Sequence, residues 1–115
     1  MKDAELAPAL LVSVERQGLW AIVRLTGDLD NDTCAELDDH LSKLTGGRDQ
    51  PRIGIDVSGL EFCDSSGIVS LLRAWRAAHE RGGSLVLVRP RDDLERRLDW
   101  LDPTDRLSIV DRTPW

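Results

Sequence analysis

The hydrophobic positions of this chain change period several times, and each change predicts a new structural element. Aliphatic and β-branched residues dominate residues 10–15 and 19–25, with a short polar stretch over residues 16–18 that ends in Gly18. This pattern predicts two strands joined by a tight turn that contains glycine. Because the connection is so short, the two strands must pair antiparallel.

Residues 30–45 switch to helical spacing. One apolar residue per turn falls on a single face of this segment, namely Cys34, Leu37, Leu41 and Leu44. Such a stripe is typical of a helix that packs on a core through one face. Thr33 and Glu36 have the spacing of a capping box at the start of the helix, and Gly46 and Gly47 are expected to end it.

The rest of the chain alternates strand and helix. Short apolar runs predict strands over residues 53–57, 84–88 and 107–110. A second helix is expected from about residue 66 to the glycines at 82 and 83, and a third over residues 92–101, which Pro103 should stop. The apolar stripe of the second helix comprises Ile68, Leu71, Leu72, Trp75 and Ala78; that of the third comprises Leu94, Leu98 and Leu101.

The predicted order is therefore β-β-α-β-α-β-α-β, which belongs to the α/β class. Strands that are separated by helices pair parallel through crossover connections, whereas the first two pair antiparallel. We expect a mixed sheet of about four to five strands with the helices packed against it. Residues 10–111 are expected to form one domain, with a loose N-terminal segment over residues 1–9 and a tail over residues 112–115.

Length and net charge reduce the number of function classes that fit this chain. The chain has 115 residues and a formal net charge of −6, so a single domain with one core is expected. An acidic domain is a poor match for nucleic acid or for an anionic membrane surface. No apolar run approaches the roughly 20 residues that span a bilayer, and the N-terminus lacks the apolar stretch of a signal peptide. The expected location is the cytoplasm.

The cysteines and histidines do not indicate a metal site. Neither Cys34 nor Cys63 has a Cys or His two to four residues away, as zinc ligands usually do. His40 and His79 lie in different predicted helices. We expect reduced, structural cysteines, no metal and no cofactor.

The most informative segment lies between the third predicted strand and the second predicted helix. It contains Asp64, Ser65, Ser66 and Gly67, where backbone N–H groups have no intrahelical partners. Asp and Ser are common N-cap residues, so helix capping alone explains these residue types. A second interpretation is that Ser65 accepts a phosphate, because a helix N-terminus favours negative charge. The residue types alone leave both interpretations open.

Three segments in a fixed order resemble a known family. They are Leu25-Thr26-Gly27-Asp28-Leu29-Asp30, followed by Thr33; Ile55-Asp56-Val57-Ser58-Gly59-Leu60; and Leu60-Glu61-Phe62 followed by Asp64-Ser65-Ser66-Gly67-Ile68. Together they resemble a STAS domain of the anti-sigma factor antagonist type, over roughly residues 10–111. The resemblance implies the STAS fold.

The resemblance also implies a regulatory cycle in a bacterial stress-response system that controls transcription. In that cycle Ser65 is phosphorylated by an anti-sigma factor, which is a serine kinase that uses Mg-ATP. The unphosphorylated protein binds the anti-sigma factor and frees its sigma factor, the phosphorylated form dissociates, and a serine phosphatase resets the cycle. The protein would then be a substrate and ligand without catalytic residues of its own.

Carried over by position, the partner surface comprises Asp28, Asp30, Thr33, Asp64, Ser66 and Gly67. Gly67 would let the partner backbone approach closely. Asp28 stands where the family more often has Glu, which keeps the charge and shortens its reach. The chain ends soon after its last predicted strand, where many members carry a further helix, and this puts such a helix in doubt. The sequence leaves a homodimer open.

Three other functions are compatible with a small α/β domain of this kind to different degrees. A STAS scaffold, sensor or accessory subunit without phosphorylation is the alternative. A serine hydrolase would need a histidine within reach of Ser65 or Ser66, and His79 lies more than three helical turns away. A phosphoaspartyl receiver would need a lysine on a late strand, and the only lysines are Lys2 and Lys43.

Overall fold

The computed structural model describes residues 9–47, 49–101 and 107–115. The strands are β1 (Leu10–Gln17), β2 (Trp20–Leu29), β3 (Arg52–Cys63), β4 (Ser84–Val88) and β5 (Ser108–Val110). The helices are α1 (Cys34–Gly46), α2 (Ser65–Glu80) and α3 (Asp92–Leu101). The predicted order of elements and the α/β class are confirmed. The expected N-terminal segment falls largely outside the described residues, as does Pro103.

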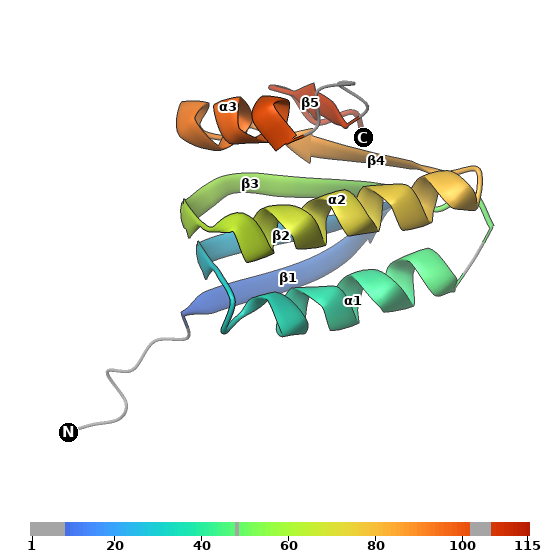
Figure 1. The fold of residues 1–115 in the computed structure, drawn as a ribbon. Helices are drawn as coiled ribbons and strands as arrows, with labels where there is room; N and C mark the ends of the chain where they lie inside the picture. Colours follow the sequence, from blue (N-terminus) through green and yellow to red (C-terminus); the bar gives the residue numbers. More distant parts are fainter. Residues whose placement is uncertain (1–8, 48, 102–106) are drawn as a thin grey trace.

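The five strands form one mixed sheet in the order β1-β2-β3-β4-β5. β1 pairs antiparallel with β2, and the pairs β2–β3, β3–β4 and β4–β5 are parallel, as the sequence predicts. In Figure 1, α1 and α2 lie side by side over one face of the sheet, while α3 lies beside β4 and β5. The carboxyl ends of β2 and β3 therefore meet at the edge where α1 and α2 begin.

The core lies between the sheet and the helices. Strand residues on the helix-covered face are fully buried, notably Val23, Leu25, Ile53, Ile55, Val57, Leu85 and Leu87. Leu37 and Leu41 of α1, Ile68 and Leu71 of α2, and Leu94 and Leu98 of α3 join the same cluster. The helical stripes are thus confirmed, with Cys34, Leu44, Leu72 and Trp75 packed at its margin. The side chain of Leu101 lies outside the described residues.

Strands β2 and β3 are longer than their hydrophobic pattern predicts. β2 continues to Leu29 instead of ending at residue 25, and β3 continues to Cys63 instead of residue 57. Polar residues and glycines in these extensions imitate turns, yet the two extensions pair with each other, with Asp28 opposite Phe62. Register shifts interrupt this pairing, which destroys the simple alternation that sequence reasoning relies on. The hairpin turn also lies later than predicted, because β1 runs through Gln17.

The sheet face opposite α1 and α2 is partly covered by the end of the chain. The indole of Trp115 lies directly over Gly54 of β3, in space that a Cβ at that position would occupy. The same ring packs against Trp20, with 5.8 Å between ring centroids. Ile22, the β2 neighbour of Gly54, is fully buried. The predicted tail therefore packs on the sheet through its last residue, and residues 107–115 contain no helix.

Among the described helices, none has the length and apolar character required to cross a membrane.

Candidate functional site

The candidate site is built where two neighbouring strands end. Leu29 and Cys63, the last residues of β2 and β3, are register partners. Beyond them the chain enters the turn over residues 30–33 and the start of α2 at Ser65. Because parallel strands end at the same edge of a sheet, these two segments lie side by side, and the N–H of Asp64 donates to the carbonyl of Leu29 at 3.1 Å.

Asp64 is the N-cap of α2. Its Oδ1 accepts a hydrogen bond from the backbone N–H of Gly67 at 3.0 Å. Its Oδ2 accepts a second one from the backbone N–H of Asn31 at 3.1 Å. One carboxylate therefore satisfies a free helical donor and joins the two segments of the site. The helix-capping interpretation holds for Asp64.

Ser65 has a different position. It is the first residue of α2 and is exposed, and its hydroxyl makes no hydrogen bond to the part of the chain that the structure describes. Ser66 is half-buried, and its hydroxyl donates to Oδ1 of Asn31 at 3.5 Å. Capping thus employs Asp64 and leaves the Ser65 hydroxyl available at the surface.

The turn over residues 30–33 is held by its own side chains. Oδ1 of Asp30 accepts from the N–H groups of Asp32 and Thr33 at 2.9 and 3.2 Å. Oγ1 of Thr33 accepts from the N–H of Asp30 at 2.9 Å and donates to the carbonyl of Asp28 at 3.0 Å. The structure therefore brings Asp28, Asp30 and Thr33 beside the Ser65 segment, as expected.

The capping box predicted from Thr33 and Glu36 is wrong. Thr33 is the N-cap residue of α1, but its side chain makes no capping hydrogen bond. The hydroxyl is occupied instead by Asp28 and Asp30, on the side away from the helix. Helix α1 nevertheless begins at Cys34 with Thr33 as its N-cap residue, as the spacing of Thr33 and Glu36 predicts, whereas Asp30, at the start of the helical pattern in the sequence, belongs to the turn.

Gly67 is required for packing inside the domain. It is buried, and a Cβ there would lie 2.8 Å from the carbonyl oxygen of Leu29, from Cγ of Leu29 and from Sγ of Cys63. The expected close approach is therefore real but internal, between α2 and the ends of β2 and β3. The structure corrects the physical reason given for Gly67, since the residue does not face outward.

Cys63, the last residue of β3, and Arg97 of α3 hold the backbone that leads into the site. Burial raises the pKa of the Cys63 thiol to about 11, so the thiol is protonated and unreactive at neutral pH. The guanidinium of Arg97, on α3, donates to the carbonyl of Cys63. This contact ties α3 to the residue that precedes Asp64. Both cysteines are free, as predicted.

A shallow depression of about 360 Å³ adjoins Ser65 between the starts of α1 and α2. It is lined by Asn31, Cys34, Asp38, Ser65, Ser66, Val69, Ser70 and Arg73. Val69, one turn beyond Ser65, is 47% exposed, and Phe62, three residues before it, is 53% exposed. The depression beside Ser65 thus combines exposed apolar area on Val69 with the hydroxyls of Ser65 and Ser66.

Sequence reasoning missed several of these residues. Asn31 and Arg97 carry no signal in the sequence, because their roles depend on contacts between distant segments. Val69 could have been found, since it is an apolar residue outside the buried stripe of α2. Among the described residues, no cluster of three or more His, Cys, Asp or Glu could hold a metal ion. The site offers an exposed hydroxyl on Ser65, the carboxylate of Asp64 and the exposed apolar side chain of Val69.

The chain is similar to known proteins both in sequence and in fold. The family model described as "Mlab, STAS domain" matches residues 12–105. A protein of Paenibacillus polymyxa named anti-sigma F factor antagonist is 27% identical over 90 residues, which cover 78% of this chain and 77% of the relative. The structure of the anti-sigma factor antagonist SpoIIAA in its unphosphorylated form matches with a TM-score of 0.73, at 21% identity, over 90% of each chain. The phosphorylated form of the Bacillus cell fate determinant SpoIIAA matches with a TM-score of 0.71, at 20% identity, over 90% of this chain and 93% of that one.

The fold and the order of its motifs thus define a small STAS module. The chain belongs to the STAS domain family, and it is similar over most of its length to proteins named anti-sigma factor antagonists.

Proposed function

We propose that this protein is an anti-sigma factor antagonist whose binding is switched off by phosphorylation of Ser65. The observation that carries the proposal is the division of labour between Asp64 and Ser65. Asp64 caps α2, and the neighbouring Ser65 hydroxyl stays exposed and without a hydrogen bond to the described residues. A serine that the fold does not use, in the motif that resembles the family's acceptor, is free for modification.

The start of α2 suits a phosphate. The N–H of Gly67 is taken by Oδ1 of Asp64, and that of Ile68 by the carbonyl of Asp64. The N–H groups of Ser65 and Ser66 belong to the first helical turn, which leaves them without intrahelical acceptors. Free N–H groups and the helix dipole both favour an anion at this position. The fold also matches both the unphosphorylated and the phosphorylated form of SpoIIAA, so the modification needs no other fold.

The proposed partner surface combines apolar and acidic side chains. Val69 supplies exposed apolar area in the depression beside Ser65, and Asp64 joins this segment to the turn that contains Asp30. A phosphate at Ser65 adds a charge of about −1.5 to −2 beside Asp64. That charge would weaken any contact between apolar groups across the same surface.

In this account the protein is the substrate and ligand of other proteins. The partner would be an anti-sigma factor that is also a serine kinase and uses Mg-ATP, and a serine phosphatase would restore Ser65. The activity would take place in the bacterial cytoplasm, within a transcriptional stress response. A hydrolase role is not supported, because His79 lies about 21 Å along α2 from Ser65 by helical rise and stacks on Trp75.

Phosphopeptide mapping tests the proposal. The protein would be incubated with its cognate kinase and Mg-ATP, the kinase being sought in a neighbouring reading frame. We expect phosphate on Ser65 in the wild type and in Ser66→Ala, and none in Ser65→Ala, which should still bind the kinase. Phosphate on Ser66 alone would overturn the assignment. Binding without any phosphate would favour the alternative, a STAS scaffold, sensor or accessory subunit.

A further inference from the structure

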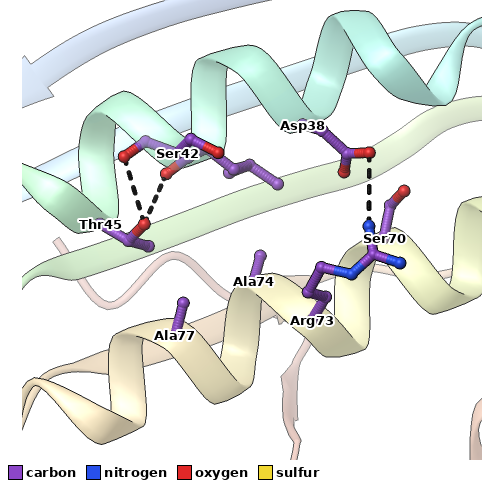
Figure 2. Close-up of a pocket in the computed structure, with 8 residues that line it drawn as sticks. Asp38, Ser42, Thr45, Ser70, Arg73, Ala74 and Ala77 are labelled. Atoms are coloured by element: carbon purple, nitrogen blue, oxygen red, sulfur yellow. Dashed lines mark hydrogen bonds and ion pairs between the residues drawn. The ribbon is translucent and has the colours of Figure 1, made fainter.

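A second depression adjoins the one beside Ser65. It has a volume of about 180 Å³, lies between the middle parts of α1 and α2, and is lined largely by small side chains. The two depressions share Asp38, Ser70 and Arg73. Figure 2 shows Arg73 of α2 pointing across the gap toward Asp38 of α1. This ion pair therefore bridges a groove that begins at Ser65.

The bridge is weakly held. The closest approach, from Nη1 of Arg73 to Oδ2 of Asp38, is 3.6 Å, which is longer than a hydrogen bond. The side chains are 65% and 32% exposed, respectively. Exposed pairs of this kind contribute little to stability and are screened by water and salt. A more strongly charged acceptor nearby would readily replace Asp38.

We propose that a phosphate on Ser65 draws Arg73 away from Asp38 and opens this bridge. The inference rests on the proposed function. Ser65 and Arg73 line the same depression, about 12 Å apart along the helix axis from the helical rise. Long side chains on a helix point back toward its N-terminus, so Arg73 leans toward the serines. A guanidinium also binds the dianionic phosphate, with two parallel hydrogen bonds, more strongly than one carboxylate.

Arg97 of α3 also brings a guanidinium close to the start of α2, but that guanidinium already has a hydrogen-bond partner. It is partly buried and donates to the carbonyl of Cys63. Moving it would leave that carbonyl without this donor, whereas moving Arg73 exposes only a solvated carboxylate. Arg73 is therefore the guanidinium that can move.

The exchange would extend the effect of phosphorylation along the groove. Asp38 would lose its cationic partner. The ion pair that separates the two depressions would no longer be present. A partner that contacts both α1 and α2 would then meet the phosphate at Ser65 and the unpaired carboxylate of Asp38. Phosphorylation would therefore change the charge distribution over about two turns of α2 instead of at Ser65 alone.

Phosphorus NMR of the full chain with phosphoserine placed at position 65 during translation tests this contact without any kinase. The second pKa of phosphoserine, ordinarily about 6, should be lower when a guanidinium pairs with the dianion. We expect this pKa to rise by about half a unit in Arg73→Ala. In Asp38→Asn it should fall slightly below the wild-type value, because the competitor for Arg73 is gone.

Arg76→Ala is the matched control, since Arg76 is exposed on the same helix but does not line the depression. It should leave the phosphoserine pKa unchanged. Equal pKa values in wild type and Arg73→Ala would overturn the inference, as would equal shifts in Arg73→Ala and Arg76→Ala. Because the phosphate is installed directly, the titration is independent of whether a kinase modifies Ser65, so failure of the proposed function is detected separately by phosphopeptide mapping.

Discussion

The backbone N–H of Asn31 donates a hydrogen bond to Oδ2 of Asp64, which lies 33 residues further along the chain. The other carboxylate oxygen of Asp64 caps α2 through Gly67. One side chain thus joins the turn over residues 30–33, which precedes α1, to the start of α2. The Ser65 hydroxyl is presented on a rigid support, although it contributes no hydrogen bond within the described chain.

Substitutions of Asp64 should separate its two contacts. Asp64→Ala removes both, and we expect the free energy of unfolding to fall by about 1–2 kcal/mol. Asp64→Ser keeps a capping oxygen for Gly67 but is too short to keep the bond to Asn31, so its loss should be roughly half as large. Urea denaturation of the variants measures the difference. Equal losses in the two variants would show that the link to Asn31 contributes nothing.

Gly67→Ala should destabilise the protein although alanine favours helices. A methyl group at position 67 would lie 2.8 Å from the backbone of Leu29 and from the Cys63 thiol. We expect overpacking to cost about 1–3 kcal/mol. Gly46→Ala is the control, because a Cβ there meets nothing within 4 Å and should leave stability unchanged or raise it slightly. Thermal unfolding of both variants measures these effects. A Gly67→Ala variant as stable as wild type would contradict the packing assigned to this residue.

The cluster of Asp56, Ser58 and Arg89 predicts a pH dependence. Burial of Asp56 alone would raise its pKa, but hydrogen bonds from Ser58 and the charge of Arg89 outweigh burial and hold the pKa below the ordinary 3.8. Oδ2 of Asp56 lies 2.7 Å from Nη2 of Arg89. A lowered pKa stabilises the folded state above pH 3.8, and this stabilisation is lost as the pH falls through the folded pKa.

We therefore expect Arg89→Ala to lower the free energy of unfolding by about 1–2 kcal/mol at neutral pH. The deficit should shrink as the pH falls below the unfolded pKa of Asp56, since a protonated carboxyl no longer needs the cation. Denaturant titrations at neutral and acidic pH measure both values. Arg91→Ala, which removes an exposed charge close by in the chain, should show no such pH dependence. A deficit that is constant with pH would refute the ionic explanation.

The aromatic contact on the open sheet face should be visible in spectra. Trp115→Ala removes the ring that lies over Gly54 and against Trp20. We expect a loss of about 1–3 kcal/mol in stability and a loss of the near-UV circular dichroism that the coupled indoles produce. Trp100→Ala removes a ring that is 84% exposed and should change neither. Similar spectra for the two variants would show that Trp115 does not pack as described.

The elements were predictable from sequence wherever the hydrophobic period was unbroken. Helix α3 and strand β4 begin and end at the predicted residues, because Leu94 and Leu98 and the apolar run of residues 84–88 follow one period each. The ends of β2 and β3 were not predictable. Their last residues pair with each other despite register shifts between the two strands, and such pairing is a property of two segments rather than of either one.

The site was predictable in outline. The motif around Ser65 and the segment from Asp28 to Thr33 were each visible in the sequence, and the structure brings them side by side. What the sequence could not supply was which side chain performs which task. Asp64 and Ser65 are both common capping residues, and only the hydrogen bonds of Asp64 distinguish them. The internal role of Gly67 likewise depends on Leu29, far away in the chain.

The central claim is that a phosphate on Ser65 releases the anti-sigma factor, and the most direct measurement is the affinity of that partner for two forms of this chain. Isothermal titration calorimetry would compare the unmodified protein with protein that carries phosphoserine at position 65. The phosphate would put a charge of about −1.5 to −2 into an interface that is partly apolar, and removing that charge from water is costly, so we expect the Kd of the phosphorylated form to be at least about tenfold higher. Equal Kd values for the two forms would contradict the account.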